Sequence, residues 1–427
     1  MLKVTFCAYD SPGHIGGPVV WIGRLLPALR RRGIEARCLF LTWGDIGPTV
    51  MALRKQGFDC PAVPSQPYIE ERVKWILERL RENPPDVFVP HNVVPGFFAA
   101  RWARAANIPT VGVFHSDDNH HRGLKHQFVC GDSDFHLSAL VCVSRKLEED
   151  ILVEQPQHTI VRRIPCGAPV LPMRVQGPVC GLRLVYVGRL VEEPKRISEV
   201  ARAFCRVIRE VPGIEAVLYG DGDATSSVEK IFATEGKGLP VRLAGKVDSQ
   251  QIQERLLECD VIVLLSDYEG LPIALMEGMA CGCVPVCLRI RSGIPELVED
   301  GVTGLLVNDR GDSFVTAIRR LQTEPGLWER LSFAARAKIE AEYSNEACAI
   351  QWADLLQSLH KAAGLRRALK IPRRLKLPKA HPAIAVEAPE PPTPSPVYLR
   401  LYRRSRMAAG KMRRRLFGSA FNRGHGA

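Results

Sequence analysis

The chain has 427 residues, a hydrophobic fraction of 46% and a mean hydropathy of −0.04, which predict a soluble protein with more than one core. No stretch approaches the roughly 20 uninterrupted apolar residues that cross a bilayer, so the pattern argues against a membrane-spanning protein. The net charge of +12 lies in the last 67 residues, which hold 17 Lys/Arg and 2 Asp/Glu and leave 41 basic (58 less 17) and 44 acidic residues (46 less 2) elsewhere.

The first part of the chain alternates short apolar runs with helical patterns. Strands are expected at 3–9, 34–41, 86–91, 110–116 and 139–144, with helices between them such as 18–33 and 95–107. The runs are continuously apolar and do not alternate, which is typical of a parallel sheet covered on both faces. This predicts a doubly wound, Rossmann-like α/β domain over residues 1–170.

Periodicity stops over 162–181, where Pro and Gly accumulate, and a linker is expected there. The alternation then restarts and predicts a second Rossmann-like domain over residues 171–345. Its expected strands are 182–188, 214–220, 241–245, 259–266, 283–288 and 303–307. A C-terminal helix over 346–362 and a basic, Pro-containing, flexible tail over 363–427 complete the predicted organisation. Two such domains in series place the carboxyl ends of two sheets at a shared cleft, where open α/β sheets bind ligands.

The segment "SDYEGLPIALMEGMACGCVPV" (266–286) follows a buried strand. Pro272 suits the first position of a helix and Gly282 the position just past its end. The free N–H groups and the dipole at this helix start form a site suited to phosphate. Glu269 and Glu277 bracket that start, and carboxylates suit vicinal hydroxyls because they only accept hydrogen bonds. The pattern fits a ligand that combines phosphates with hydroxyls, such as a nucleotide sugar, although Glu277 alone could equally face solvent or pair with a basic residue.

Five segments, in order along residues 1–360, resemble retaining glycosyltransferases of family 4. These segments are "GHIGGPVVWIGRLLPALRRRGIEA", "RRIPCGAPV", "VYVGRLVEEPKR", "VLYGDGD" and the block from 266 onward, which resembles the E-x7-E region. Cys166 stands where the family usually has asparagine. The resemblance implies the GT-B fold: two Rossmann-like domains facing a cleft. It does not reach the basic tail.

The resemblance also implies roles for individual residues. Arg189 and Lys195 would bind the donor diphosphate, Glu277 the ribose hydroxyls, and Glu269 the transferred sugar. Backbone groups of the turn and of the glycine-rich loops complete the expected donor site, at Gly270, Leu271, Pro272, Gly16, Gly17, Gly220 and Gly222. His115 ends a strand facing the expected cleft and joins Glu269, Arg189 and Lys195 as a catalytic candidate, and His91 is a weaker one. Taken alone, such histidines are more often structural, and an arginine such as Arg189 more often forms a surface ion pair.

The reaction expected from the resemblance is transfer of a hexose, with retention, from a nucleotide diphosphate sugar to a glycan or lipid-linked acceptor. Cell-envelope or surface polysaccharide biosynthesis is the expected context. Two cations and a helix start would stabilise the leaving diphosphate, so neither a metal nor another cofactor is expected. The alternative is a catalytically weak scaffold that binds sugar nucleotides in a polysaccharide assembly complex. Residues 115–127, "HSDDNHHRGLKHQ", are interpreted as a flexible acceptor loop and not as a metal site.

The cysteines and the two ends of the chain indicate where in the cell the protein is expected. The 13 cysteines are scattered, several in apolar runs, which predicts reduced thiols. The first residues, "MLKVTFCAYD", lack a signal-peptide layout, so a cytoplasmic protein is expected. The tail mixes Arg and Lys with Leu, Tyr, Phe and Met, which suits peripheral binding to an anionic inner membrane face. A solvated extension without a partner is the competing interpretation, and nucleic acid is disfavoured because no nucleic-acid motif accompanies the charge.

Overall fold

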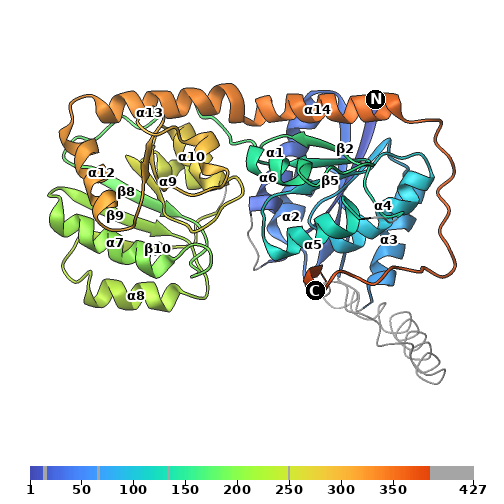
Figure 1. Ribbon diagram of the computed structural model, residues 1–427, viewed down its shortest axis with the longest axis horizontal. Helices are drawn as coiled ribbons and strands as arrows, with labels where there is room; N and C mark the ends of the chain where they lie inside the picture. Colours follow the sequence, from blue (N-terminus) through green and yellow to red (C-terminus); the bar gives the residue numbers. More distant parts are fainter. Residues whose placement is uncertain (13–16, 65–67, 132–133, 249–250, 385–427) are drawn as a thin grey trace, which may run out of the picture.

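The computed structural model describes residues 1–384 apart from 13–16, 65–67, 132–133 and 249–250, and shows two α/β domains. The N-terminal domain is the blue and cyan half of Figure 1. Its elements are β1 (Leu2–Tyr9), α1 (Gly17–Arg31), β2 (Ile34–Thr42), α2 (Pro48–Lys55), β3 (Ala62–Pro64), α3 (Ile69–Glu82), β4 (Val87–Pro90), α4 (Val94–Ala105), β5 (Val111–Phe114), α5 (Asn119–Phe128), β6 (Ala139–Cys142), α6 (Arg145–Leu152) and β7 (Ile160–Arg163).

The C-terminal domain repeats the plan. Its elements are β8 (Leu182–Val187), α7 (Ile197–Glu210), β9 (Ile214–Tyr219), α8 (Thr225–Thr234), β10 (Val241–Gly245), α9 (Ile252–Leu256), β11 (Val261–Leu264), α10 (Ile273–Cys281), β12 (Val284–Leu288), α11 (Ile294–Leu297), β13 (Leu305–Val307), α12 (Asp312–Thr323) and α13 (Leu327–Lys338). The π-helical η1 (Ile339–Tyr343), α14 (Asn345–Ala362) and the short η2 (Pro382–Ile384) follow.

All described strand pairs are parallel. The C-terminal sheet has the order β10-β9-β8-β11-β12-β13. In the N-terminal domain β3-β2-β1-β4 and β5-β6-β7 form two sheets, and isolated parallel bridges at Phe88–Thr110 and His91–Val113 join β4 to β5. Central strands such as β11 and β12 are buried along their whole length, as the continuous apolar runs predicted, because helices cover both sheet faces.

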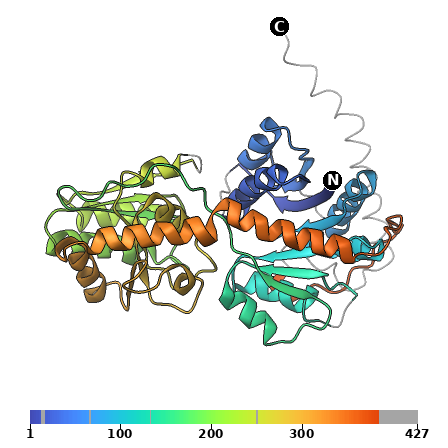
Figure 2. The same ribbon diagram turned by 90° about the horizontal axis from the view of Figure 1, so that it is seen from above.

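Two chain crossings join the domains and lie side by side. The segment after β7 leads to β8, and η1 leads from α13 over the C-terminal domain to α14 over the N-terminal domain, which Figure 2 shows from above. The crossings are hydrogen-bonded: the Ala168 N–H donates to the Tyr343 carbonyl at 2.9 Å and the Asn345 N–H to the Ala168 carbonyl at 3.0 Å. A Cβ on Gly167 would lie 2.6 Å from the Asn345 Cα, so glycine permits this close pairing.

The first part of the tail, residues 363–384, is a packed strap, so the prediction of flexibility from residue 363 onward is wrong for this segment. It runs from the end of α14 around the N-terminal domain to α5 (Figure 1). Leu369, Ala380 and Ile384 are buried, and the His381 N–H donates to Gln127 Oε1 at 3.0 Å. Apolar side chains therefore face the domain, while the seven Lys and Arg side chains of the strap are exposed. The predicted tail beyond residue 384 lies outside the described residues.

Two further expectations concern cysteines and membrane spans. The cysteines are free thiols, and all except Cys130 and Cys180 are buried, as predicted. None of the helices in the described part of the chain combines the length and apolar character that a bilayer crossing requires.

Candidate functional site

The site is built around the start of α10. The helix spans Ile273–Cys281 as predicted, with Pro272 in extended conformation at its N-cap and Gly282 in the left-handed region at its end, with φ 92°. No side chain caps the first turn, so its backbone N–H groups remain available. Because β11 ends at Leu264, the segment Leu265–Leu271 carries Glu269 and Gly270 past the sheet edge toward the N-terminal domain.

Glu269 is paired with Lys195 in front of this helix start. Both side chains are largely buried, with 10% and 14% of their surface exposed, and the Lys195 Nζ donates to Glu269 Oε1. Lys195 lies in the turn after β8, two residues before α7. The two candidates therefore meet although 74 residues separate them. The ion pair presents an amine and a carboxylate oxygen together.

Arg189 extends from the loop that follows β8, and the predicted glycines hold this loop in place. The Tyr186 hydroxyl donates to the Arg189 carbonyl at 2.9 Å, while the Arg189 side chain is exposed. A Cβ on Gly220 would lie 1.9 Å from the Gly188 carbonyl oxygen, and one on Gly222 2.5 Å from that of Leu190. In this structure these glycines pack against the Arg189 loop.

Glu277 lies inside α10 and forms an ion pair with a residue of the N-terminal domain. Arg24 on α1 donates through Nη2 to Glu277 Oε1, and the two side chains are 15% and 7% exposed. Burial raises the pKa of Glu277, and the Arg24 guanidinium opposes that rise. Of the two interpretations left open for a lone glutamate, an ion pair is the one found in this structure. Arg24 was not predicted.

The N-terminal domain contributes a histidine wall. His115 follows β5 and His91 follows β4, with their Nε2 atoms 2.6 Å apart, and Trp21 packs on both rings. The Cys166 Sγ lies 3.6 Å from His115 Nδ1. Burial, with the neighbouring His121, lowers the pKa of His91 to about 3. Burial and the neighbouring histidines hold the pKa of His115 well below its usual value, so both rings are neutral at pH 7.

Close backbone approaches bring the two domains together at this site. A Cβ on Gly270 would lie 1.8 Å from the His115 carbonyl oxygen, so the turn before α10 lies against the end of β5. A Cβ on Gly17 would lie 3.1 Å from Ile273 Cδ1, which places the start of α1 against that of α10. Gly16, predicted with Gly17, lies outside the described residues. The structure therefore brings His115, Glu269–Pro272, Lys195 and Glu277 to one part of the interface between the domains.

The segment interpreted as a flexible acceptor loop is mostly helical. Residues 119–128 form α5, whose N-cap Asp118 accepts from the His121 N–H at 2.9 Å and lies 2.8 Å from His121 Nδ1. Asp118 caps the start of the helix through both contacts with His121, which explains why this segment is helical. Among the residues that the structure describes, no three His, Cys, Asp or Glu side chains are grouped so as to hold a metal ion.

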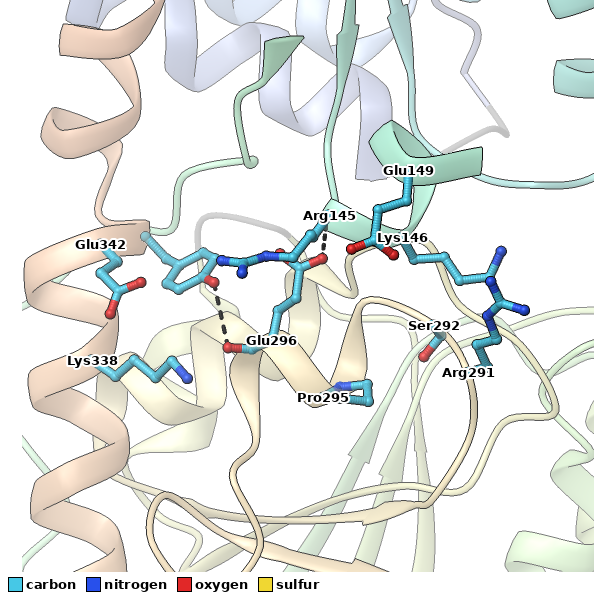
Figure 3. Close-up of a pocket in the computed structure, with 10 residues that line it drawn as sticks. Arg145, Lys146, Glu149, Arg291, Ser292, Pro295, Glu296, Lys338 and Glu342 are labelled. Carbon is cyan, nitrogen blue, oxygen red and sulfur yellow. Dashed lines mark hydrogen bonds between the residues drawn. The ribbon is translucent and has the colours of Figure 1, made fainter. Parts of the chain in front are cut away.

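A cavity of about 460 Å³ lies between the domains near the second crossing (Figure 3). At its wall Glu296 accepts from the Arg145 N–H at the start of α6 and from Arg163 Nε at 2.8 Å. The Tyr343 hydroxyl donates to the Glu296 carbonyl at 3.4 Å. None of the predicted site residues lines the cavity, which is lined by four cationic and three carboxylate side chains. We therefore assign these contacts to holding the domains together.

Comparison with known proteins adds three observations. The description "Glycosyltransferase Family 4" matches residues 15–170, and "Glycosyl transferases group 1" matches residues 181–324. The amylovoran biosynthesis glycosyltransferase AmsK of Erwinia amylovora is 35% identical over 187 residues, which are 42% of this chain and 45% of that protein. The lipopolysaccharide core biosynthesis glycosyltransferase LpsD of Rhizobium meliloti is 28% identical over 356 residues, 80% of this chain and 95% of the relative.

A solved structure, Anabaena HepE in complex with UDP-glucose, superposes with a TM-score of 0.68 at 18% identity, covering 84% of this chain and 100% of that one. At this identity the likeness shows a shared fold. The match to AmsK spans less than half the length of that relative, whereas the match to LpsD spans nearly all of it.

Proposed function

Since both halves of the chain belong to glycosyltransferase families and together have the GT-B fold, we propose that the protein is a retaining hexosyltransferase. It transfers a hexose from a nucleotide diphosphate sugar to a glycan or lipid-linked acceptor in the biosynthesis of a surface polysaccharide. The relatives named above act in polysaccharide and lipopolysaccharide biosynthesis by their names, which supports this context. The observation that carries the proposal is the meeting of the α10 start, the Lys195–Glu269 pair and Glu277 opposite His115.

The donor's groups match the chemistry of the cleft. In the proposed complex the diphosphate lies between the α10 N–H groups, Arg189 and Lys195, because anions are stabilised at helix starts and by charged hydrogen-bond donors. Glu277 accepts hydrogen bonds from the ribose hydroxyls. Glu269 accepts from the hydroxyls of the transferred sugar, and its bond to Lys195 keeps sugar and diphosphate sites adjacent.

The proposed reaction proceeds on one face of the sugar. The acceptor hydroxyl attacks the anomeric carbon from the side on which the diphosphate leaves, and the departing phosphate takes its proton. Arg189, Lys195 and the helix start stabilise the charge that develops on the leaving group, so we propose that no divalent metal or other cofactor is required. The protein then contributes positioning and electrostatic stabilisation, and the closed cleft keeps water from the donor.

A panel of nucleotides tests the proposal. Structures of the similar fold were solved with UDP and UDP-glucose, so UDP-sugars are the first donors to examine, followed by GDP-, ADP- and dTDP-sugars. We expect one nucleotide to raise the melting temperature, because a ligand that binds the native state stabilises it. The corresponding sugar donor should be hydrolysed slowly and transferred rapidly when acceptor is added, as product analysis would show.

The same panel distinguishes the proposed enzyme from the alternative, a scaffold that binds sugar nucleotides. A scaffold would bind a sugar nucleotide, shift the melting temperature and produce no transfer with any acceptor glycan or lipid extract. If no nucleotide shifts the melting temperature at millimolar concentration, the proposed donor site is wrong.

We further propose that the enzyme works at the cytoplasmic face of an anionic membrane, bound through its basic tail, with nucleic acid disfavoured as a partner. The strap exposes seven Lys and Arg side chains on the N-terminal domain. Each basic residue near an anionic surface contributes about 1 kcal/mol. A lipid-linked acceptor would reach the cleft from that surface.

Vesicle sedimentation tests this association. The full chain should bind phosphatidylglycerol vesicles at low salt and leave them at about 0.5 M salt, because salt screens exposed charges. Replacing both Arg373 and Arg374 with glutamine should weaken binding about thirtyfold, which corresponds to about 2 kcal/mol. The matched control replaces Arg319 and Arg320, two exposed residues of α12. Equal binding to neutral vesicles would contradict the proposal.

A further inference from the structure

Arg24 lies at the interface between the domains, and neither the predicted site residues nor the proposed mechanism includes it. It lies in the second turn of α1, on the N-terminal domain, and its Nη2 binds Glu277 Oε1 on the C-terminal domain. The side chain is 15% exposed, and its Nη1 is buried without a hydrogen-bond partner among the described residues. A buried guanidinium at the donor site with unused bonding capacity is a costly arrangement unless it serves the ligand.

Glu277 depends on Arg24 for its charge. Burial of a carboxylate favours its protonated form, and a cation in contact favours the ionised form. Among the residues that the structure describes, Arg24 is the cation paired with Glu277. The Cys281 thiol is on its own helix, and Arg336 of α13 is bound to the Ala280, Met173 and Leu171 carbonyls. On the N-terminal side, Cys166 and His115 are neutral at pH 7, since burial raises the pKa of the thiol well above its usual value and lowers that of the ring.

We propose that Arg24 is a positioning residue of the donor site: it holds Glu277 as an oriented carboxylate whose second oxygen accepts the ribose hydroxyls. The inference rests on the proposed function, which assigns the ribose to Glu277. A carboxylate has room for this, because its two oxygens offer about four acceptor sites and Arg24 occupies one of them. Arg24 itself need not touch the donor.

The arrangement couples donor binding to domain closure. Arg24 and Glu277 belong to different domains, so the ion pair exists only while the cleft is closed. A donor that binds the ionised, oriented Glu277 therefore stabilises the closed form, and closure raises donor affinity by the same factor. An open cleft would expose Glu277 without its cation.

The test measures UDP affinity by calorimetry from pH 6 to pH 9 in the wild type, Arg24→Met, Arg24→Lys and the control Arg31→Met. Arg31 is on the same helix, is exposed and pairs with Glu346. If UDP does not bind the wild type, the nucleotide of the panel that does bind replaces it. Inorganic pyrophosphate serves as a second probe, because it has phosphates and no ribose.

In Arg24→Met the pKa of Glu277 rises further, because burial then acts without an opposing cation, so this variant should lose carboxylate charge toward the lower end of the pH range. UDP affinity of this variant should therefore be about tenfold weaker at pH 6.5 than at pH 8.5, whereas the wild type and Arg31→Met change less than about threefold. Arg24→Lys should retain most of the wild-type profile, and pyrophosphate affinity should stay within about threefold of the wild type.

A double-mutant cycle keeps the proposal testable if Arg24→Met folds poorly. In a Glu277→Gln background the titrating group is absent, so adding Arg24→Lys or Arg24→Met should cause no further loss of UDP affinity. The proposal is overturned by a further loss in that background, by an Arg24→Met profile parallel to the wild type, or by an equal loss of pyrophosphate affinity. A wild type that binds no nucleotide of the panel contradicts the proposed function itself, and this inference with it.

Discussion

Replacing Lys195 with alanine should lower kcat/KM about a thousandfold, which corresponds to about 4 kcal/mol of transition-state stabilisation. Two effects add in this variant. The leaving diphosphate loses a cation that lies beside the helix start, and Glu269, which is 10% exposed and paired with Lys195, becomes an uncompensated carboxylate close to the phosphates. Lys195→Arg should recover part of the rate, because charge is kept while the position of the donor nitrogen changes.

The control and the readout separate this effect from a loss of fold. Lys230→Ala removes an exposed lysine from α8 in the same domain and should leave kcat/KM unchanged within about twofold. The melting temperature of Lys195→Ala should fall, because Glu269 loses its buried partner, so rates are compared at a temperature at which circular dichroism shows the variant to be folded. If Lys195→Ala retained more than a tenth of the wild-type kcat/KM, leaving-group stabilisation would have to come from elsewhere in the cleft.

Local signals in the sequence were sufficient to predict α10 and its surroundings. The apolar segment between Pro272 and Gly282 predicted the extent of the helix, Ile273–Cys281, and Gly282 lies just past its end as expected. Pro272 was expected at the first helical position and is instead the N-cap residue, in extended conformation. Continuous apolar runs likewise predicted the parallel sheets. The GT-B arrangement of the two domains is shared with the solved relatives, yet it was expected only through the resemblance.

Local sequence signals could not predict contacts between residues that are far apart in the sequence. Arg24 and Glu277 are separated by 253 positions, and in the sequence Arg24 is one arginine in an amphipathic helix. Gly220 and Gly222 were expected in the donor site only through the resemblance, and the backbone that approaches them here belongs to Gly188 and Leu190. The strap shows the same limitation. Its basic residues led to the expectation of a flexible tail, suited to an anionic membrane or solvated, whereas apolar residues spaced between them, such as Leu369 and Ile384, bury against the N-terminal domain.

The second large effect is expected for Glu269→Gln, and it should separate binding from transfer. We expect kcat to fall about a hundredfold, because the neutral amide accepts more weakly from the sugar hydroxyls in the transition state. UDP carries no transferred hexose, and loss of the carboxylate releases Lys195 from its ion pair toward the phosphates. UDP affinity should therefore stay the same or increase, which calorimetry can measure beside the steady-state rates.

A fall in kcat without a fall in UDP affinity would distinguish a role of Glu269 in sugar binding from a role in the fold. A carboxylate that merely supported the fold would lower the melting temperature, UDP affinity and kcat together, whereas one that contacts the sugar leaves the nucleotide site intact. Glu254→Gln, an exposed change on α9, supplies the control for loss of one negative charge in the same domain. A Glu269→Gln variant with unchanged kcat would mean that the ion pair with Lys195 serves the structure alone. The hydroxyls of the transferred sugar would then have to be bound by other residues of the cleft.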